Sequence, residues 1–421
     1  MEKVNVFQIG LGEFGRYGFR KFLAMHGNLD EVELEFRGLA EKDFEKRDDA
    51  VDVAESEGVD LDFYSSAREM YDAASEVDGK VLVYDAGPTA THAQNIYRSM
   101  RHEFFHVAEK PPSMTREQHI RERKMSAGTD AFWKADFIER ESPVVRKALE
   151  EVAGKNIESI KVFRESSVGV QRLLQPVQRA GVQGGDILDK MTHEIFILDM
   201  LEESNGDNEL DLVRAESDLM PFSRHGEKFM SVKGNRTAEK NRAATGRTGA
   251  LIQGGAEVKL HSSWLGVSRS AREEARRLDF VDHNPVVSEP RQTGKEAFVD
   301  EEARFFVVEG ERNLFGDMLK EKLFDLDRER EVELPDLEGD QLHRVLKKAV
   351  LKAAGREEGM TDENEIDRFM NLIFDIRESA IDHSGDPVVE LRSSLERLDP
   401  LVYDQKAFED YEVDKLMGVK G

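Results

Sequence analysis

The sequence predicts an α/β protein with two domains: an N-terminal doubly wound parallel sheet, and a C-terminal α+β domain with a mainly antiparallel, open-faced sheet. Three observations carry this prediction. Strand-like and helix-like segments alternate at the start of the chain, a glycine-rich turn follows the first strand, and several extended segments follow one another after residue 139. At 421 residues the chain is also too long for one ordinary hydrophobic core.

The first domain, residues 1–138, is built from apolar strands separated by helices. The expected strands cover residues 3–9, 32–40, 81–86, 104–108 and 131–137. The expected helices cover residues 15–25, 91–100 and 115–126. Strands that alternate with helices predict right-handed crossovers and a parallel sheet that is covered on both faces.

The second domain, residues 139–385, has a different pattern, because strands follow one another after one or two helices. The expected helices cover residues 144–152, 186–201 and 366–380. The expected strands cover residues 157–166, 210–216, 256–265 and 304–308, and the polar stretch 233–249 is typical of a surface loop. This order predicts an antiparallel sheet in an α+β domain, followed by a C-terminal extension, residues 386–421, that ends in a loosely packed tail.

The chain is strongly acidic. Asp and Glu number 86 against 60 Lys and Arg, which gives a formal net charge of -26, and the acids are spread over the whole length. Such a surface repels phosphate backbones, so no nucleic-acid partner is expected. An ordinary acidic protein fits these numbers, but we favour a halophilic protein, adapted to molar salt, in which excess carboxylates keep the chain soluble.

The composition excludes several other classes. The chain has no cysteine, which excludes disulfides, thiolate metal sites and a cysteine nucleophile. No apolar run is long enough to span a bilayer, so no membrane partner is expected. Residues 1–6 enter a strand pattern directly, without the features of a secretory signal. A soluble cytoplasmic protein is therefore expected.

A glycine-rich turn joins the first strand to the first helix. Gly10, Gly12 and Gly15 have the spacing Gly-x-Gly-x-x-Gly. The first glycine permits a tight bend, the second lets a pyrophosphate approach the backbone, and the third lets helix pack on strand. Glu13 and Phe14 lie between these glycines, just before the expected helix, whose N-terminal N–H groups attract phosphates. This Rossmann pattern predicts that these five residues contact a dinucleotide cofactor.

The end of the second strand supplies an acid. Glu41 follows residues 32–40, where a carboxylate accepts hydrogen bonds from the ribose hydroxyls of NAD and repels the 2′-phosphate of NADP. Lys42, Arg16 and Arg47 are basic residues nearby, so NADP stays an alternative cofactor. The cofactor is therefore NAD or NADP, with NAD favoured.

Residues 102–106 match the zinc pattern His-Glu-x-x-His. That pattern binds metal only on a helix, where His102 and His106 share one face. Here residues 104–108 are expected to form a buried strand, and the sequence suggests no third ligand. No metal site is expected.

Three further residues carry possible chemistry. Lys110, in the segment Glu109-Lys110-Pro111, stands at the C-terminal end of a strand, where doubly wound sheets bind ligands. Asp189 and His193 stand four residues apart in an expected helix and therefore share one face. Each residue alone is more simply explained as an ordinary structural or surface group, and spacing does not join the three.

The combination of these motifs resembles the Gfo/Idh/MocA oxidoreductases, which include glucose–fructose oxidoreductase and inositol dehydrogenase. The resemblance covers roughly residues 3–380. Four matches carry it in the family's order: the glycine turn, the turn that lies against the cofactor, the Glu-Lys-Pro segment, and a glycine pair followed by Asp-x-x-x-His. These are Gly10 to Gly15; Ala86-Gly87-Pro88-Thr89 with His92; Glu109-Lys110-Pro111; and Gly184-Gly185 with Asp189 and His193.

The resemblance implies a role for each residue. His193 is the general base on a substrate hydroxyl, or the acid in the reverse direction. Lys110 hydrogen-bonds the same oxygen and stabilises charge on it. Asp189 orients the site and binds another hydroxyl. Pro88, Thr89, His92, Glu109 and Lys110 are cofactor-binding residues.

The reaction implied is NAD(P)-dependent hydride transfer at a hydroxyl or carbonyl carbon of a sugar, polyol or sugar derivative. Two alternatives stay open: a glycosidase that works through transient oxidation and elimination, and a non-catalytic sensor of cofactor or sugar. The family also implies a homo-oligomer, a dimer or tetramer. Trp264 and Leu265 are candidate interface residues, or they pack inside the monomer. Arg172 and Arg179 are candidates for an anionic sugar, or are surface residues in salt bridges.

Overall fold

The computed structural model describes two compact units. The described residues are 2–27, 29, 32–127, 129, 132–166, 187–204, 211–225, 228–231, 243–253, 256–263, 267–293, 296–356 and 363–383. The first unit consists of Met1–Glu141 and Glu338–Asp367, and the second consists of Ser142–Leu337 and Arg368–Gly421. Within the described part of the chain, no helix is long and apolar enough to cross a membrane.

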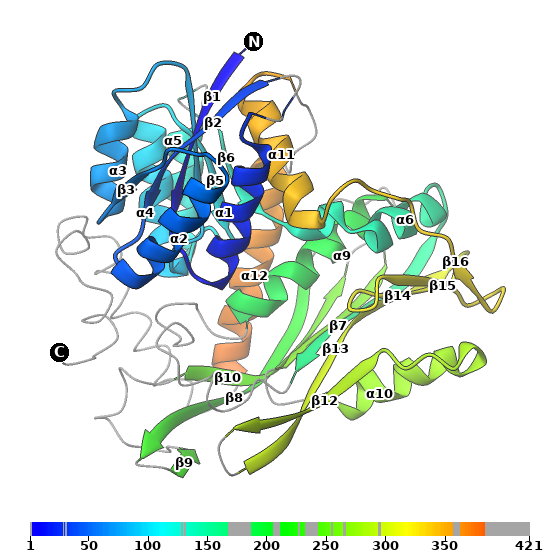
Figure 1. Ribbon diagram of the computed structural model, residues 1–421. Helices are drawn as coiled ribbons and strands as arrows, with labels where there is room; N and C mark the ends of the chain where they lie inside the picture. The colour runs from blue at the N-terminus through cyan, green and yellow to red at the C-terminus, as the bar shows by residue number, and fades with distance from the viewer. Residues whose placement is uncertain are drawn as a thin grey trace. The chain divides into compact units, whose positions relative to one another are not determined.

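The first unit contains a six-stranded parallel sheet in the order β3-β2-β1-β4-β5-β6 (Figure 1). The strands are β1 (Glu2–Ile9), β2 (Val32–Ala40), β3 (Asp62–Tyr64), β4 (Lys80–Asp85), β5 (Phe105–Glu109) and β6 (Trp133–Asp136). The strand order switches between β1 and β4: β2 and β3 lie on one side of this pair, and β5 and β6 lie on the other. Doubly wound sheets bind their ligands outside the carboxyl ends of the strands at this point.

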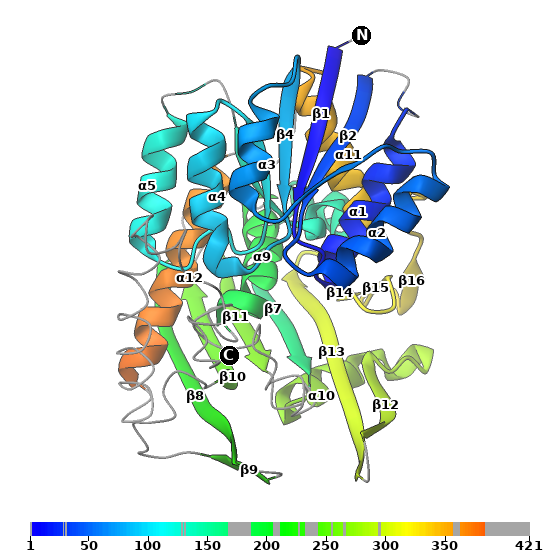
Figure 2. The same cartoon turned by 60° about the vertical axis from the view of Figure 1, so that its left-hand side comes forward.

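Helices cover both faces of this sheet. They are α1 (Glu13–Met25), α2 (Phe44–Ser56), α3 (Ala67–Ala74), α4 (Thr89–Arg101), α5 (Arg116–Ser126) and α11 (Gln341–Ala353). Figure 2 shows α1 and α2 on one side of the strands and α3 and α4 on the other. Alternate residues of β1 divide between two apolar clusters, one under α1, α2 and α11 and one under α3.

Helix α11 belongs to the first unit, although the sequence placed residues 338–367 in the second domain. Leu346, Ala349 and Val350 join the apolar cluster that contains α1 and the central strands. An amphipathic pattern predicts that α11 buries one face, but it does not say against which sheet. The boundary between the two units falls again inside α12 (Glu363–His383), which contains the predicted amphipathic segment 366–380.

The second unit contains a mainly antiparallel sheet, as the sequence predicted, in the order β16-β15-β14-β13-β7-β11-β10-β8-β9, with β12 paired to β13. Among the strand pairs of this sheet that the structure describes, β11 and β7 alone run parallel. The strands are β7 (Ile157–Ser166), β8 (Asp211–His225), β9 (Lys228–Ser231), β10 (Ala243–Gln253), β11 (Glu257–Ser263), β12 (Val286–Thr293), β13 (Glu296–Gly310), β14 (Leu314–Asp317), β15 (Lys322–Asp325) and β16 (Arg330–Val332).

Helices partly cover this sheet. Helix α9 (Thr192–Ser204) contacts β7, and α6 (Pro143–Val152) contacts α9, β14 and β15. Helix α10 (Arg269–Ala275) and the short 3-10 helix that follows it form an apolar cluster with Phe163 of β7 and Phe305 of β13. In β11, Glu257 and Lys259 are exposed, so part of the sheet is left open.

Two local predictions for the second domain were wrong. Residues 243–249, expected in a surface loop, lie in β10 and pair with both β8 and β11, because long-range strand pairing outweighs their polar and glycine-rich composition. The segment before α9 was expected to be α-helical, but Ile187–Met191 form a π-helical turn. The predicted loop residues 233–242 and the extension 386–421 lie outside the described residues.

Candidate functional site

The glycine turn has the geometry that its spacing predicted. Gly10 has φ of 87°, and a Cβ there would lie 2.8 Å from the carbonyl oxygen of Ala86. A Cβ on Gly15 would overlap the carbonyl oxygen of Gly10, so only glycine lets α1 approach the turn this closely. At Gly12, by contrast, a Cβ would meet nothing within 4 Å, which leaves the backbone open to a ligand.

The N-terminus of α1 begins at a glycine. Gly12 is the N-cap residue and has no side chain to cap the first turn, which begins with Glu13 and Phe14. Phe14 is 48% exposed. Uncapped N–H groups at a helix N-terminus are donors for an anionic group such as a phosphate.

A buried glutamine that the sequence analysis missed supports this turn. The Nε2 of Gln8 donates hydrogen bonds to the carbonyl oxygens of Gly10 at 2.9 Å and Gly15 at 2.7 Å. Gln8 is fully buried in β1, among apolar neighbours. A polar residue between apolar neighbours in a buried stretch of strand is the signal that would have found it, since buried amides need partners.

Glu41 lies at the end of β2 and touches the glycine turn. The backbone N–H of Leu11 donates to its Oε2 at 2.7 Å, and the N–H of Asp43 donates to its Oε1 at 3.0 Å. The side chain is largely buried. Each carboxylate oxygen has a second lone pair, so Glu41 can support the turn and still accept hydrogen bonds from a ligand.

The turn after β4 is built around a buried carboxylate that the sequence analysis did not single out. Oδ1 of Asp85 accepts a hydrogen bond from the N–H of Gly87 at 3.0 Å, and Oδ2 accepts one from Asn95 at 2.8 Å. Pro88 is the N-cap residue of α4 and Thr89 begins the helix. Asp85 therefore ties the predicted cofactor turn to the helix that follows it.

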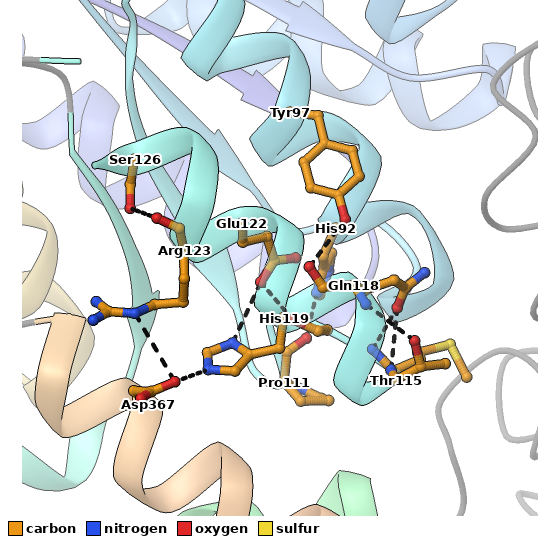
Figure 3. Close-up of polar contacts among 12 residues, drawn as sticks. His92, Tyr97, Pro111, Thr115, Gln118, His119, Glu122, Arg123, Ser126 and Asp367 are labelled. Atoms are coloured by element: carbon orange, nitrogen blue, oxygen red, sulfur yellow. Dashed lines mark hydrogen bonds and ion pairs between the residues drawn. The ribbon is translucent and has the colours of Figure 1, made fainter. Parts of the chain in front are cut away.

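His92 connects this turn to the loop after β5. Its Nδ1 lies 2.9 Å from the carbonyl oxygen of Pro111, and its Nε2 lies 3.0 Å from the carbonyl oxygen of Gly87. The side chain is 1% exposed. Figure 3 shows His92 of α4 beside Pro111. The sequence predicted His92 as a cofactor contact, and the structure shows that it holds two loops together.

The loop after β5 contains Lys110 and is anchored on both sides. Before it, the hydroxyl of Tyr84 donates to Oε1 of Glu109 at 2.8 Å. Lys110 itself is half-buried, and the peptide bond to Pro111 is cis. After it, Oε1 of Gln118 accepts hydrogen bonds from the N–H groups of Met114 and Thr115, the N-cap residue of α5 (Figure 3).

A buried carboxyl lies next to this loop. The hydroxyl of Ser113 donates to Oε2 of Glu122 at 2.5 Å, and Nδ1 of His119 lies 3.7 Å from the same oxygen. His119 Nε2 lies 2.9 Å from Oδ1 of Asp367, whose side chain is 41% exposed. Burial raises the pKa of Glu122, and its contacts with His119 and Ser113 act in the opposite direction. Figure 3 shows His119 between the two carboxyl groups.

The two histidines of the zinc-like pattern do not share a helix face. His102 ends α4, whereas His106 is buried in β5, where its Nδ1 lies 2.8 Å from the hydroxyl of Ser99. Burial lowers the pKa of His106 to about 4. No cluster of metal-ligating side chains occurs among the residues that the structure describes.

The second unit contains the other predicted catalytic residues. His193 is 4% exposed in α9. Asp189 lies in the π-helical turn just before it, where about 4.4 residues rather than 3.6 make a turn, so the α-helical spacing assumed from the sequence does not apply. Gly184, Gly185, Arg172, Arg179, Trp264 and Leu265 lie outside the described residues.

Ion pairs hold α9 to the sheet of the second unit. Glu194 is fully buried, with Arg164 of β7 at 3.5 Å and Arg304 of β13 at 3.3 Å from its Oε1. At the other end of α9, Arg368 binds Asp199 with two hydrogen bonds, at 3.0 and 3.3 Å. Glu194 follows His193 directly, so these contacts also fix the backbone that carries His193.

No family model and no curated protein sequence matches this chain. Solved structures share its fold over nearly its whole described length. A levoglucosan dehydrogenase in complex with NADH and levoglucosan is 16% identical and has a TM-score of 0.64, over 91% of this chain and 98% of that one. A UDP-N-acetylglucosamine 3-dehydrogenase from Acidithiobacillus ferrooxidans is 17% identical, with a TM-score of 0.60 over 92% and 100% of the two chains.

A third structure of the same fold is a 3-ketoreductase from Actinomadura kijaniata in complex with NADP and TDP-benzene. It is 16% identical, with a TM-score of 0.58 over 90% of this chain and 98% of that one. The fold is therefore that of two-domain NAD(P)-dependent sugar dehydrogenases and reductases, which confirms the predicted fold class.

Proposed function

We propose that this chain is an NAD(P)-dependent oxidoreductase of the Gfo/Idh/MocA family that acts on a CH–OH group of a sugar, polyol or sugar derivative. The observation that carries the proposal is the set of features at the carboxyl ends of β1, β2, β4 and β5. They are the uncapped glycine turn, Glu41, the Pro88 turn with His92, and the Lys110 loop. These features meet where a doubly wound sheet binds a dinucleotide.

The chain's own groups fit a dinucleotide. The open backbone at Gly12 and the uncapped first turn of α1 would hold the pyrophosphate. Glu41, fixed beside the turn by the N–H of Leu11, would accept hydrogen bonds from the adenosine ribose. Pro88 and Thr89, at the start of α4, would lie nearer the nicotinamide, next to the Lys110 loop. A bound nicotinamide supplies the acceptor or donor of a hydride.

The three reacting side chains would divide the work on the substrate. His193 would remove the proton from the reacting hydroxyl, because an imidazole exchanges protons near neutral pH. The ammonium group of Lys110 would donate a hydrogen bond to the same oxygen and stabilise the charge that develops there. Asp189 would bind a neighbouring hydroxyl and orient the ring. In reduction, His193 would return the proton.

The comparisons support a carbohydrate substrate and leave its identity open. The similar structures include a levoglucosan dehydrogenase and a UDP-N-acetylglucosamine 3-dehydrogenase. They also include a 3-ketoreductase in complex with NADP and TDP-benzene. Their ligands include both NADH and NADP. The carboxylate of Glu41 favours NAD in this chain, because it would repel a 2′-phosphate.

A direct test is a panel of sugars, polyols, sugar acids and nucleotide sugars assayed with NAD and with NADP. Each assay is run in dilute buffer and in molar salt, since the charge of -26 predicts that salt is needed for a stable, active protein. Saturable formation of NADH or NADPH with one substrate class supports the proposal. Binding of neither dinucleotide in either salt condition contradicts it.

A further inference from the structure

His92 makes contacts that a cofactor-binding residue alone does not require. Both ring nitrogens lie within hydrogen-bond distance of backbone carbonyl oxygens, Gly87 O on one side and Pro111 O on the other. A carbonyl only accepts, and a neutral imidazole has one N–H, so only the doubly protonated ring donates to both. The two carbonyls belong to the two loops that flank the predicted nicotinamide position.

The surroundings of His92 contain both signs of charge. On α5, Glu122 and His119 are fully buried, and the charges of His119 and His92 both act against the burial that raises the pKa of Glu122. On β5, His106 is buried, and the charge of His92 adds to the burial that lowers its pKa. On β4, Asp85 is paired with Asn95. His92 therefore interacts electrostatically with groups on both α5 and β5.

Further hydrogen bonds hold the loop after Pro111. Ser113 is bound by Glu122, and the N–H groups of Met114 and Thr115 are bound by Gln118. These contacts begin three residues after Lys110. Pro111, whose carbonyl oxygen contacts His92, follows Lys110 directly in the chain.

We propose that His92 is a positioning residue for Lys110: by bridging Gly87 O and Pro111 O through its two ring nitrogens, it sets the Lys110 loop at a fixed distance from the Pro88 turn. The inference rests on the proposed function, because it takes Lys110 as the group that binds the reacting oxygen. It deepens that function by assigning to His92 a task that binding of the cofactor does not include. We call these two contacts of His92 the clamp.

The first test compares His92→Gln with His102→Gln. The glutamine amide at position 92 can donate to one of the two carbonyls, whereas His102 lies on the same helix, exposed, and contacts neither loop. His92→Gln should lower kcat about 10²-fold, the size expected when a reacting group is displaced by about 1 Å. The Kd for NADH should change less than about threefold, and His102→Gln should match the parent protein in both.

The second test does not depend on turnover. Hydrogen–deuterium exchange of the ligand-free protein is followed in peptides covering residues 86–91 and 110–115, and corrected for intrinsic exchange. Loss of one hydrogen bond should speed exchange of the 110–115 peptide roughly tenfold in His92→Gln.

The outcomes separate the clamp from the function. Unchanged exchange in His92→Gln overturns the clamp, whatever the activity. Faster exchange with unchanged kcat also overturns the proposal, because the loop is then loosened without consequence for Lys110. If the parent protein binds no dinucleotide and turns over no substrate, the proposed function fails, and the exchange data still decide whether His92 joins the two loops.

Discussion

In the first unit, hydrogen bonds from buried polar side chains fix the loops predicted to bind the cofactor; in the second unit, ion pairs fix the helix that carries His193. Gln8, Asp85 and His92 each hold two backbone or amide groups within the first unit. In the second, Glu194 sits between two arginines, and Asp199 is bound by a third.

The two kinds of contact meet different requirements: one positions a loop, and the other fastens a helix. Hydrogen bonds to backbone atoms define where a loop lies to within a few tenths of an ångström, and salt affects them little. Ion pairs fasten a helix to a sheet, but a buried pair contributes through the penalty of leaving one partner uncompensated. We therefore expect changes in the first unit to alter binding and turnover, and changes at Glu194 to alter folding.

The largest effect is expected for Lys110→Met. Removing the ammonium group should lower turnover by about 10³-fold or more, because the hydrogen bond to the developing charge is lost. Binding of NADH, followed by fluorescence, should stay within about threefold. Lys124→Met, at an exposed position on α5, is the matched control and should be normal. Near-normal turnover of Lys110→Met would remove Lys110 from the site.

A comparable effect on stability is expected for Glu194→Ala. The change leaves Arg164 and Arg304 without the carboxylate that lies between them, and breaking a buried pair costs about 3–5 kcal/mol in the free energy of unfolding. Glu273→Ala removes an exposed pair with Arg269 on α10 and should cost less than about 1 kcal/mol. Urea denaturation measures both, and equal losses would contradict the role given to Glu194.

A smaller effect is expected from pH, through His106. Its pKa is about 4 in the folded protein against 6.5 for the free side chain. Between these two pH values the side chain is protonated in the unfolded chain and neutral in the folded one. Its contribution is fully present above about pH 6.5 and is lost as the pH falls towards 4, by about 3 kcal/mol at most. His106→Gln should show a shallower fall in unfolding free energy over this range. Parallel curves for the two proteins would contradict the assignment.

The smallest effect is expected for Glu41→Gln. The amide keeps one acceptor oxygen, so either the bond from Leu11 or the one from Asp43 is lost, and the negative charge disappears. The ratio of NAD to NADP affinity should fall about tenfold, since repulsion of the 2′-phosphate is removed. Titration of each cofactor measures the ratio, and an unchanged ratio would show that Glu41 supports the turn without selecting the cofactor.

Much of the first unit follows from the sequence. The strand 32–40 coincides with β2, and the other predicted strands of the sheet differ from the observed ones by one or two residues. Gly10 and Gly15 have the conformations that their spacing demands. These features were predictable because they depend on contacts within a few residues: alternation along a strand, a positive φ, and the close approach of helix and turn.

The supports of the site were not predictable in this way. Gln8, Asp85 and the pairing of Glu194 with Arg164 and Arg304 join residues that are distant in sequence, or that look like any other polar residue in the chain. With 86 acids in the sequence, nothing local distinguishes Glu194 from the rest. Only burial makes such a carboxylate important, since an unpaired charge is costly where water is excluded.

The sequence by itself determined the type of the first sheet, the glycine turn and the strand ends that carry Glu41 and Lys110, because each is specified by neighbours along the chain. Tertiary structure decided that α11 packs on the first sheet, that residues 243–249 are a strand, and that His92 joins two loops. The physical reason is that these features depend on which surfaces and backbone groups are brought together by folding, and several partners fit the same local pattern.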